Sequence, residues 1–314
     1  MTNPEILVKY IRDGLVEQEH RGFAVLADKE RSFDYIGDTK NTPFFIRSCA
    51  KPLQASLLID YGMDKFYEMT EKEIALCSAS HAGEKVHTDI AKGLLDKIGL
   101  DESYLKCGMQ KPLSKTRQAE MLINKESVSV LQNNCSGKHI MMLGLCKMKG
   151  WDLRTYDDVE HPLQIEIKNR IYELCHVKQN YPITKDGCGV PIVSMPLDNI
   201  LHGYLNLFCN PKYEKFKNAF LNNPYIIGGE DRTDTKIIEN SEGLVAKVGA
   251  GGLCVVVNTI EQEAFVVKIS DCDMKARELV VLQIMKNLKW ADIEFDNTIK
   301  TLHGDVVGEI VVSV

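Results

Sequence analysis

A serine and a lysine three residues apart, in the stretch RSCAKPLQ (residues 47–54), form the first pair that could do chemistry. Residues at this spacing share one face of a helix, so Ser48 and Lys51 can act as nucleophile and base. A lysine base must be neutral, and lowering its pKa from about 10.4 to about 7 requires burial or a neighbouring cation. Pro52 disfavours a helical conformation at Lys51, although proline is tolerated in the first turn of a helix. Taken alone, the spacing is more typical of a helix-capping serine followed by a surface lysine.

The stretch CSASHAGEKVH (residues 77–87) contains two histidines and a glutamate in the order H-x-x-E-x-x-H. A spacing of six residues places His81 and His87 on different faces of a helix, which argues against a metal ion shared by the two. Ser80 lies in a glycine-containing loop, where its hydroxyl can either face a cleft or cap the following helix. The residues of this stretch leave both roles for Ser80 open.

The stretch NNCSGKH (residues 133–139) opens an apolar helix. Backbone N–H groups at such a helix start suit an anion or an oxyanion. Cys135 and Lys138 repeat the three-residue spacing of the first pair, so both can point to the same side of that helix.

A second cysteine lies in the tight turn KDGCGVP (residues 185–191), which also carries Asp186. If the fold brings Cys188 close to Cys135, the two thiols could hold zinc with a third ligand. Neither cysteine belongs to a C-x-x-C motif, however, and the spacing alone favours two free thiols.

Two further side chains could contribute charge to a site. Lys268 lies in FVVKISDCD (residues 265–273), after an apolar run that predicts an inner strand. It could equally be an outward residue of an alternating strand. Arg232 lies in the polar stretch GGEDRTDT (residues 228–235), where it could bind a carboxylate or belong to an ordinary surface loop.

The elements that must position these residues follow from hydrophobic periodicity and from turn and cap signals. Predicted strands cover residues 22–28, 33–38, 244–249, 253–260, 263–270 and 306–314. Predicted helices cover residues 51–62, 70–81, 83–100, 138–150, 161–177 and 274–288. Strands at both ends of the chain with helices between them indicate an α+β fold, in which one sheet is assembled from both termini and a helical subdomain packs beside it.

The composition narrows the class of protein. The 314 residues are 44% hydrophobic and 26% charged, as in ordinary folded proteins, and we expect one domain over residues 1–314. A net charge of −6 argues against a nucleic-acid-binding surface, which carries a basic stripe. The chain has no run of about 20 apolar residues, which a membrane span requires. The first residues lack the apolar core of a secretory signal, so we expect the ten cysteines to be reduced thiols in the cytoplasm.

Taken together, RS-x-x-K-P, SH-x-GE-x-x-H, N-C-S-G-K-H and D-G-C-G-x-P in this order resemble the asparaginase II family, the rhizobial type of L-asparaginase. The resemblance runs from residues 20–28 to residues 268–290. It implies a fold like that of serine β-lactamases, penicillin-binding proteins and glutaminases, with an antiparallel sheet built from both chain ends and flanked by helices. Those enzymes carry K-T-G on a strand. The chain has no K-T-G, and the resemblance implies that Lys268-Ile-Ser occupies the comparable late strand.

The resemblance also implies roles for individual residues. It implies two catalytic serine–lysine pairs, Ser48 with Lys51 and Ser80 with Lys268. It implies a zinc ion held by Cys135, Lys138 and Cys188, although a lysine ligand must be deprotonated to bind. Expected supporting or substrate-binding residues are Arg47, Glu84, Asp186, Arg232 and Cys254.

The activity expected from this resemblance is hydrolysis of L-asparagine to L-aspartate and ammonia by a cytoplasmic homodimer, with neither a nucleic acid nor a membrane as partner. Backbone N–H groups at Ser48 and just after Lys268 would form the oxyanion hole. A glutaminase differs by one substrate methylene, worth only about 1–3 kcal/mol, and remains an alternative. A non-catalytic protein related to penicillin-binding proteins is a third hypothesis.

Overall fold

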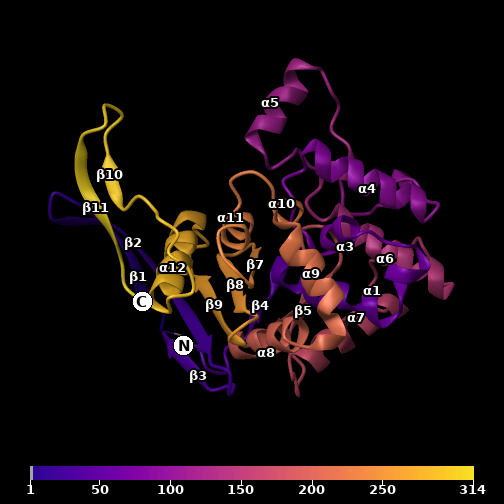
Figure 1. Ribbon diagram of the computed structural model, residues 1–314, viewed down its shortest axis with the longest axis horizontal. Helices are drawn as coiled ribbons and strands as arrows, with labels where there is room; N and C mark the ends of the chain where they lie inside the picture. The colour runs from indigo at the N-terminus through magenta and orange to yellow at the C-terminus, as the bar shows by residue number, and fades with distance from the viewer. Residues whose placement is uncertain (1–2) are drawn as a thin grey trace.

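The computed structural model describes residues 3–314 and contains an eight-stranded antiparallel sheet built from both ends of the chain (Figure 1). The order is β10-β11-β1-β2-β9-β8-β7, with β3 paired to β2. The strands are β1 (Glu5–Arg12), β2 (Leu15–Ala27), β3 (Phe33–Ile36), β7 (Leu244–Gly249), β8 (Leu253–Asn258), β9 (Glu263–Ile269), β10 (Thr298–Lys300) and β11 (Val306–Val312). The two ends join where β2 pairs with β9, from Gly22 opposite Ile269 to Ala27 opposite Ala264. The predicted α+β class and the shared sheet are confirmed.

The sheet changes character along its width. Every residue of β7 and β8 is buried, so both faces of the sheet are covered there. Helices α8 (Leu197–Phe208) and α12 (Met274–Asn287) pack against β8 and β9. At the other side, hairpins β1–β2 and β10–β11 project away from the helical body (Figure 1). The sequence pattern missed β1 and the start of β2, because β1 buries only the adjacent Leu7 and Val8, without alternation, and the start of β2 is exposed.

The helical part lies beside β7 and holds most of the motif residues. Its helices are α1 (Ala50–Asp60), α2 (Met63–Phe66), α3 (Glu71–Ser78), α4 (Lys85–Lys97), α5 (Lys115–Ile123), α6 (Ser136–Lys149), α7 (Pro162–Leu174), α9 (Glu214–Asn222), α10 (Pro224–Ile227) and α11 (Thr233–Glu239). A small sheet of β4 (Phe44–Phe45), β6 (Pro191–Met195) and β5 (Ile183–Lys185) lies among them.

The local signals read from the sequence correspond to real helix ends. Thr70 and Glu73 form the expected capping box at the start of α3. Gly150 ends α6 in the left-handed conformation, with φ of 68°. Pro162 occupies the first turn of α7. These side chains fix where three of the helices begin or end.

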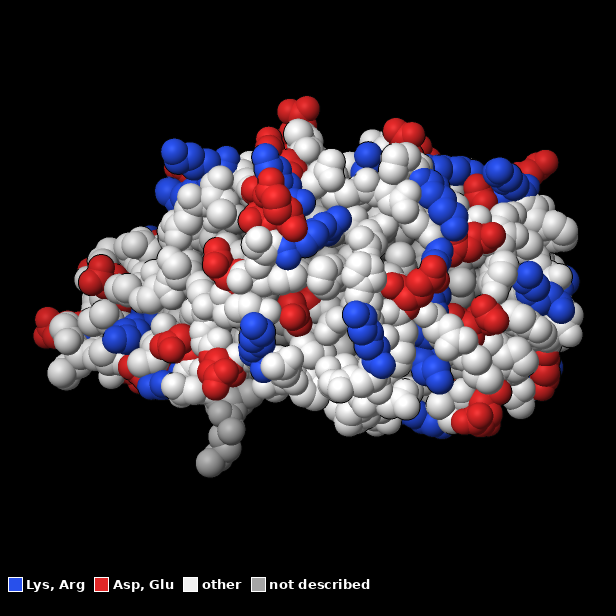
Figure 2. Space-filling model, turned by 90° about the horizontal axis from the view of Figure 1, so that it is seen from below, with Lys and Arg blue, Asp and Glu red and all other residues white. Residues whose placement is uncertain are grey.

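The surface shown in Figure 2 carries basic and acidic side chains in alternation, so neither sign dominates that face. Among residues 3–314, no helix is both long and apolar enough to cross a membrane.

One close contact determines how α6 meets α3. A methyl group added at Gly137 would lie 2.2 Å from the carbonyl oxygen of Leu76, far inside van der Waals contact. The absence of a side chain therefore lets the start of α6 approach the end of α3. Both helix ends carry residues of the motifs described above, so this contact sets the distance between them.

We expect Gly137→Ala to lower the free energy of unfolding by about 1–3 kcal/mol, because the backbones of α3 and α6 must separate. Gly93→Ala is the matched control, since Gly93 lies in α4 with nothing within 4 Å of an added methyl group. That change should be neutral or stabilising by up to about 1 kcal/mol. Urea unfolding of both variants tests this, and equal stability of Gly137→Ala and wild type would contradict the argument.

Candidate active site

The amine of Lys51 is buried at the start of α1 and contacts three oxygen atoms from other segments. Its Nζ lies 2.7 Å from the carbonyl oxygens of Ala79 and Asn134, and 3.0 Å from Oγ of Ser80. Burial lowers the pKa of Lys51 to about 8, with the neighbouring thiolate of Cys135 acting in the opposite direction. A neutral lysine has two N–H donors and one lone pair. The two carbonyls can take both donors, which directs the lone pair toward the hydroxyl of Ser80.

Ser48 lies on the 3₁₀ turn η1 (Arg47–Cys49), which leads directly into α1. The turn is held from below by β6, because the N–H of Ile46 donates to the carbonyl of Val193. Arg47 adopts a left-handed conformation with φ of 50°, which is uncommon for a non-glycine residue and often marks a functional turn. Ser48 is half-buried, whereas Ser80 is only 2% exposed. Ser48 is therefore the more accessible of the two hydroxyls.

Both serines line one cavity of about 300 Å³ between the helical part and the end of β7. Its wall also includes Asn134, the 248–252 turn and the side chains of two arginines. The volume suits a molecule the size of an amino acid, because a water molecule occupies about 30 Å³.

The two arginines of this cavity are Arg232 and Arg277. Each has a buried Nε without a hydrogen-bond partner among the described residues. Arg277 donates only a weak bond, at 3.4 Å, to the carbonyl of Gly249, and the Nε of Arg232 lies 3.9 Å from a carboxylate oxygen of Asp234. Both guanidinium groups thus keep donors free for an anion in the cavity. Arg277 was missed from the sequence because it lies inside a regular helix, where an arginine is usually on the surface.

Two thiols and an amine meet behind Lys51. Nζ of Lys138 donates to Sγ of Cys188 at 3.1 Å, and all three side chains of the predicted zinc set are at most 5% exposed. A hydrogen bond from Cys188 holds the pKa of Cys135 well below its ordinary value, and Lys51 and Lys138 add to this effect. Burial disfavours the charged form of Lys138, yet the thiolate of Cys135 raises its pKa overall.

This arrangement fits zinc in its donor chemistry, since sulfur and nitrogen are preferred zinc ligands and the three donors converge. Among residues 3–314 there is no cluster of three or more His, Cys, Asp or Glu side chains that could hold a metal. The candidate set is therefore limited to the two cysteines and the lysine.

Arg47 and Asp186 form an ion pair beside this cluster. Nε of Arg47 donates to Oδ1 of Asp186 at 2.8 Å. Burial raises the pKa of Asp186, but Lys138 and Arg47 lower it further, so the carboxylate stays charged. The sequence predicts that Arg47 or Arg232 binds the substrate carboxylate. Arg47 is poorly placed for this role, because it is already paired with Asp186.

Three other predicted residues lie outside the cavity. Nζ of Lys268 donates to the carbonyl of Ile269 at 2.7 Å and makes no bond to Ser80, whose hydroxyl is paired with Lys51. Glu84 is engaged by the hydroxyl of Tyr225 and the N–H of Glu230. Cys254 is fully buried in β8. The Ser80–Lys268 pair expected from the sequence is not formed.

Lys247, on β7, lies next to the η1 turn that carries Ser48, where Lys268 was expected. It is fully buried, its Nζ lies 3.3 Å from Oδ2 of Asp234, and its carbonyl accepts a hydrogen bond from Sγ of Cys49. The sequence signal was available, because Lys247-Val248-Gly249 differs from K-T-G only in its middle residue. This signal is not distinctive, because β7, β8 and β9 are equally apolar, and only the structure shows that β7 contacts the turn that carries Ser48.

A family model described as L-asparaginase II matches residues 8–312 of the chain. No curated protein matches the sequence in a direct comparison. Among solved structures, a β-lactamase from Mycobacterium bovis is 10% identical with a TM-score of 0.43, covering 85% of this chain and 94% of that one. A Bacillus glutaminase is 10% identical with a TM-score of 0.38, covering 87% and 92%. At this level of similarity, neither structure carries a conclusion about activity.

The buried pair of Lys247 and Asp234 leads to a stability prediction. Burial raises the pKa of Asp234, but Lys247 and Arg232 lower it below its ordinary value of 3.8. The charged carboxylate therefore stabilises the fold above pH 4 or so, and this contribution is lost as the pH falls through its folded pKa.

We expect Lys247→Met to lower the free energy of unfolding at pH 7 by about 3–5 kcal/mol, because it leaves a buried carboxylate without its main partner. The double variant Lys247→Met/Asp234→Asn should recover part of this loss. Urea unfolding at pH 7 measures both variants, and repeating it below about pH 3 shows whether their difference from wild type shrinks as Asp234 is protonated. A Lys247→Met protein as stable as wild type at pH 7 would disprove the role of the pair.

Proposed function

The chain belongs to the L-asparaginase II family, and from this premise we propose that it hydrolyses L-asparagine to L-aspartate and ammonia through Ser48, Lys51 and Ser80. Membership of the family indicates an amidohydrolase with a small-molecule substrate. The observation that supports the serine–lysine mechanism is the buried Lys51 amine, whose lone pair is directed at a serine hydroxyl beside a second, accessible serine.

In the proposed reaction, Oγ of Ser48 attacks the side-chain amide carbon of the substrate. Its proton passes through the hydroxyl of Ser80 to Nζ of Lys51, and is then delivered to the departing nitrogen, which leaves as ammonia. Water then attacks the acyl-enzyme, and its proton passes through Ser80 to Lys51. The proton returns to Oγ of Ser48 as L-aspartate is released. Ser48 is preferred as nucleophile because it is the more accessible serine and lies at a helix start, where the dipole favours developing negative charge.

In the proposed complex, the substrate binds to guanidinium donors that have no hydrogen-bond partner among residues 3–314. Arg232 and Arg277 hold the α-carboxylate, since both keep free guanidinium donors in the cavity. Backbone N–H groups at Ser48 and in the 248–252 turn bind the oxyanion. This turn follows Lys247, and it replaces the segment after Lys268 that was expected to serve this purpose.

We further propose that Cys135, Lys138 and Cys188 hold one zinc ion. The support is the convergence of their three buried donors. Zinc bound there would supply a positive charge next to the catalytic lysine and could act as a Lewis acid. The ion pair between Arg47 and Asp186 holds the turn that carries Cys188, and so helps to position this ligand.

The first test is Ser48→Ala, which should lower kcat for L-asparagine by roughly 10³-fold or more, because the nucleophile is lost. Ser56→Ala is the matched control. Ser56 lies on α1, the helix that follows the turn of Ser48, is fully buried, and donates only to the carbonyl of Leu53. Ammonia release from asparagine and from glutamine measures activity and preference together. Wild-type turnover by Ser48→Ala would exclude it as nucleophile.

The second test concerns the metal. Protein purified without chelator should contain about one zinc per chain, as expected for one site of this kind. The double variant Cys135→Ser/Cys188→Ser should contain almost none. Cys146→Ser is the control, because Cys146 is also buried in α6 but lies outside the cluster. Elemental analysis measures the zinc content of each protein, and full metal retention by the double variant would refute the assignment.

A further inference from the structure

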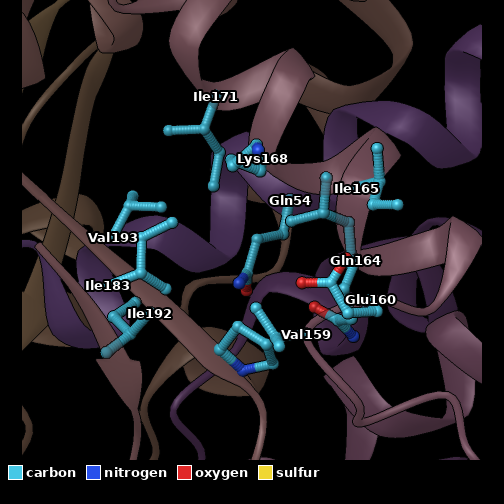
Figure 3. Close-up of a pocket in the computed structure, with 12 residues that line it drawn as sticks. Gln54, Val159, Glu160, Gln164, Ile165, Lys168, Ile171, Ile183, Ile192 and Val193 are labelled. Atoms are coloured by element: carbon cyan, nitrogen blue, oxygen red, sulfur yellow. The ribbon is translucent and has the colours of Figure 1, made fainter. Parts of the chain in front are cut away.

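A second cavity, of about 250 Å³, lies between α1, α7 and the β5–β6 pair (Figure 3). It shares no lining residue with the cavity that holds the serines. Its walls are mainly aliphatic, with Ile167, Ile171, Ile183, Ile192 and Val193 among them. Residues 164, 167, 168 and 171 face it from one side of α7, as their helical spacing requires.

Two buried amide side chains border this apolar space. Gln54 is 1% exposed and Gln164 is 3% exposed, and the amide oxygen of each lacks a hydrogen-bond partner among the described residues. The structure gives Gln54 no side-chain hydrogen bond at all, and Figure 3 shows its amide end pointing from α1 toward the middle of the cavity lining. A buried amide without a partner costs free energy of about 1–3 kcal/mol. A ligand with N–H donors in the cavity would satisfy the two orphaned amide oxygens.

The cavity also has one charge of each sign. Glu160 and Lys168 both line it, and no ion pair or side-chain hydrogen bond of either is found within residues 3–314. They are therefore not paired with each other, although they border the same space. Val159, Ile165 and Ile183 are between 37% and 46% exposed, so the aliphatic lining continues to an open mouth.

We propose that this cavity is a second ligand site and that it binds a free α-amino acid with a branched aliphatic side chain. The ammonium group pairs with Glu160, and the carboxylate pairs with Lys168. The amides of Gln54 and Gln164 bond to the same polar end, and the aliphatic side chain lies among the isoleucines. A ligand of this class matches the separated charges, the orphaned amides, the apolar walls and the volume together.

The second cavity borders α1 and β6, which position Ser48 and Lys51, but it contains neither of these two residues. Gln54 is three residues after Lys51 on α1, and the carbonyl of Val193 accepts the N–H of Ile46 at 3.2 Å, just before Ser48. A ligand here contacts both the helix and the strand that position the catalytic serine. The inference does not depend on which amide the catalytic cavity hydrolyses.

Isothermal titration of the whole protein with L-leucine, L-isoleucine and L-valine tests the proposal. We expect saturable binding of at least one of them, weakened at least tenfold by Lys168→Met and by Gln54→Leu. Lys217→Met is the matched control, since Lys217 is also a half-buried helical lysine without a charged partner, and it should bind as wild type. L-aspartate should not displace the ligand, and Arg277→Met should leave its binding unchanged.

Two results would overturn the proposal. One is the absence of saturable binding by all three amino acids. The other is unchanged binding in both Lys168→Met and Gln54→Leu, or displacement by L-aspartate, which would place the amino acid in the catalytic cavity.

Discussion

The structure depends on keeping one amine out of water. Lys51 is 1% exposed, and a buried ammonium is costly unless several acceptors surround it. Its three oxygen partners come from the end of α3 and from the segment before α6, far from α1 in sequence. Two of the partners are backbone carbonyls, so they depend on the path of the chain rather than on side-chain identity. The close approach of α3 and α6 at Gly137 therefore helps to set the positions of the carbonyls that surround Lys51.

Charge around this amine is distributed in two groups. Behind it lie the thiols and Lys138, where a thiolate and Asp186 offset the cation. In front lies the cavity with its two arginines. Among the described residues, Asp234 is the only buried carboxylate near these arginines, and it is already paired with Lys247. The front group therefore retains an excess of positive charge. That excess suits a substrate with a free carboxylate. The charged form of Lys51 is disfavoured mainly by burial, and the cations of Lys138 and Lys247 lower its pKa further.

Helix α1 joins two spaces of different chemistry. Lys51 contacts Ser80 in the wall of the polar cavity, and Gln54, about one turn further along, lines the aliphatic one. The strand β6 has the same double role, because it supports the turn before Ser48 and also forms a wall of the second cavity. Nine of the eleven residues of α1 are buried, because α3, α6, α7 and α8 all pack against it.

The sequence by itself determined the elements and the family resemblance. Apolar runs predicted β7, β8 and β9 nearly to the residue, the capping box located α3, and four ordered motifs indicated an amidohydrolase. These features are local, since periodicity and caps depend on neighbouring residues. Only the tertiary structure decided the partners. It paired Lys51 with Ser80, assigned Arg47 to Asp186, and brought Lys247 rather than Lys268 near Lys51. Strand order and helix packing set those contacts, and three equally apolar strands carry no local signal of which one contacts the turn that carries Ser48.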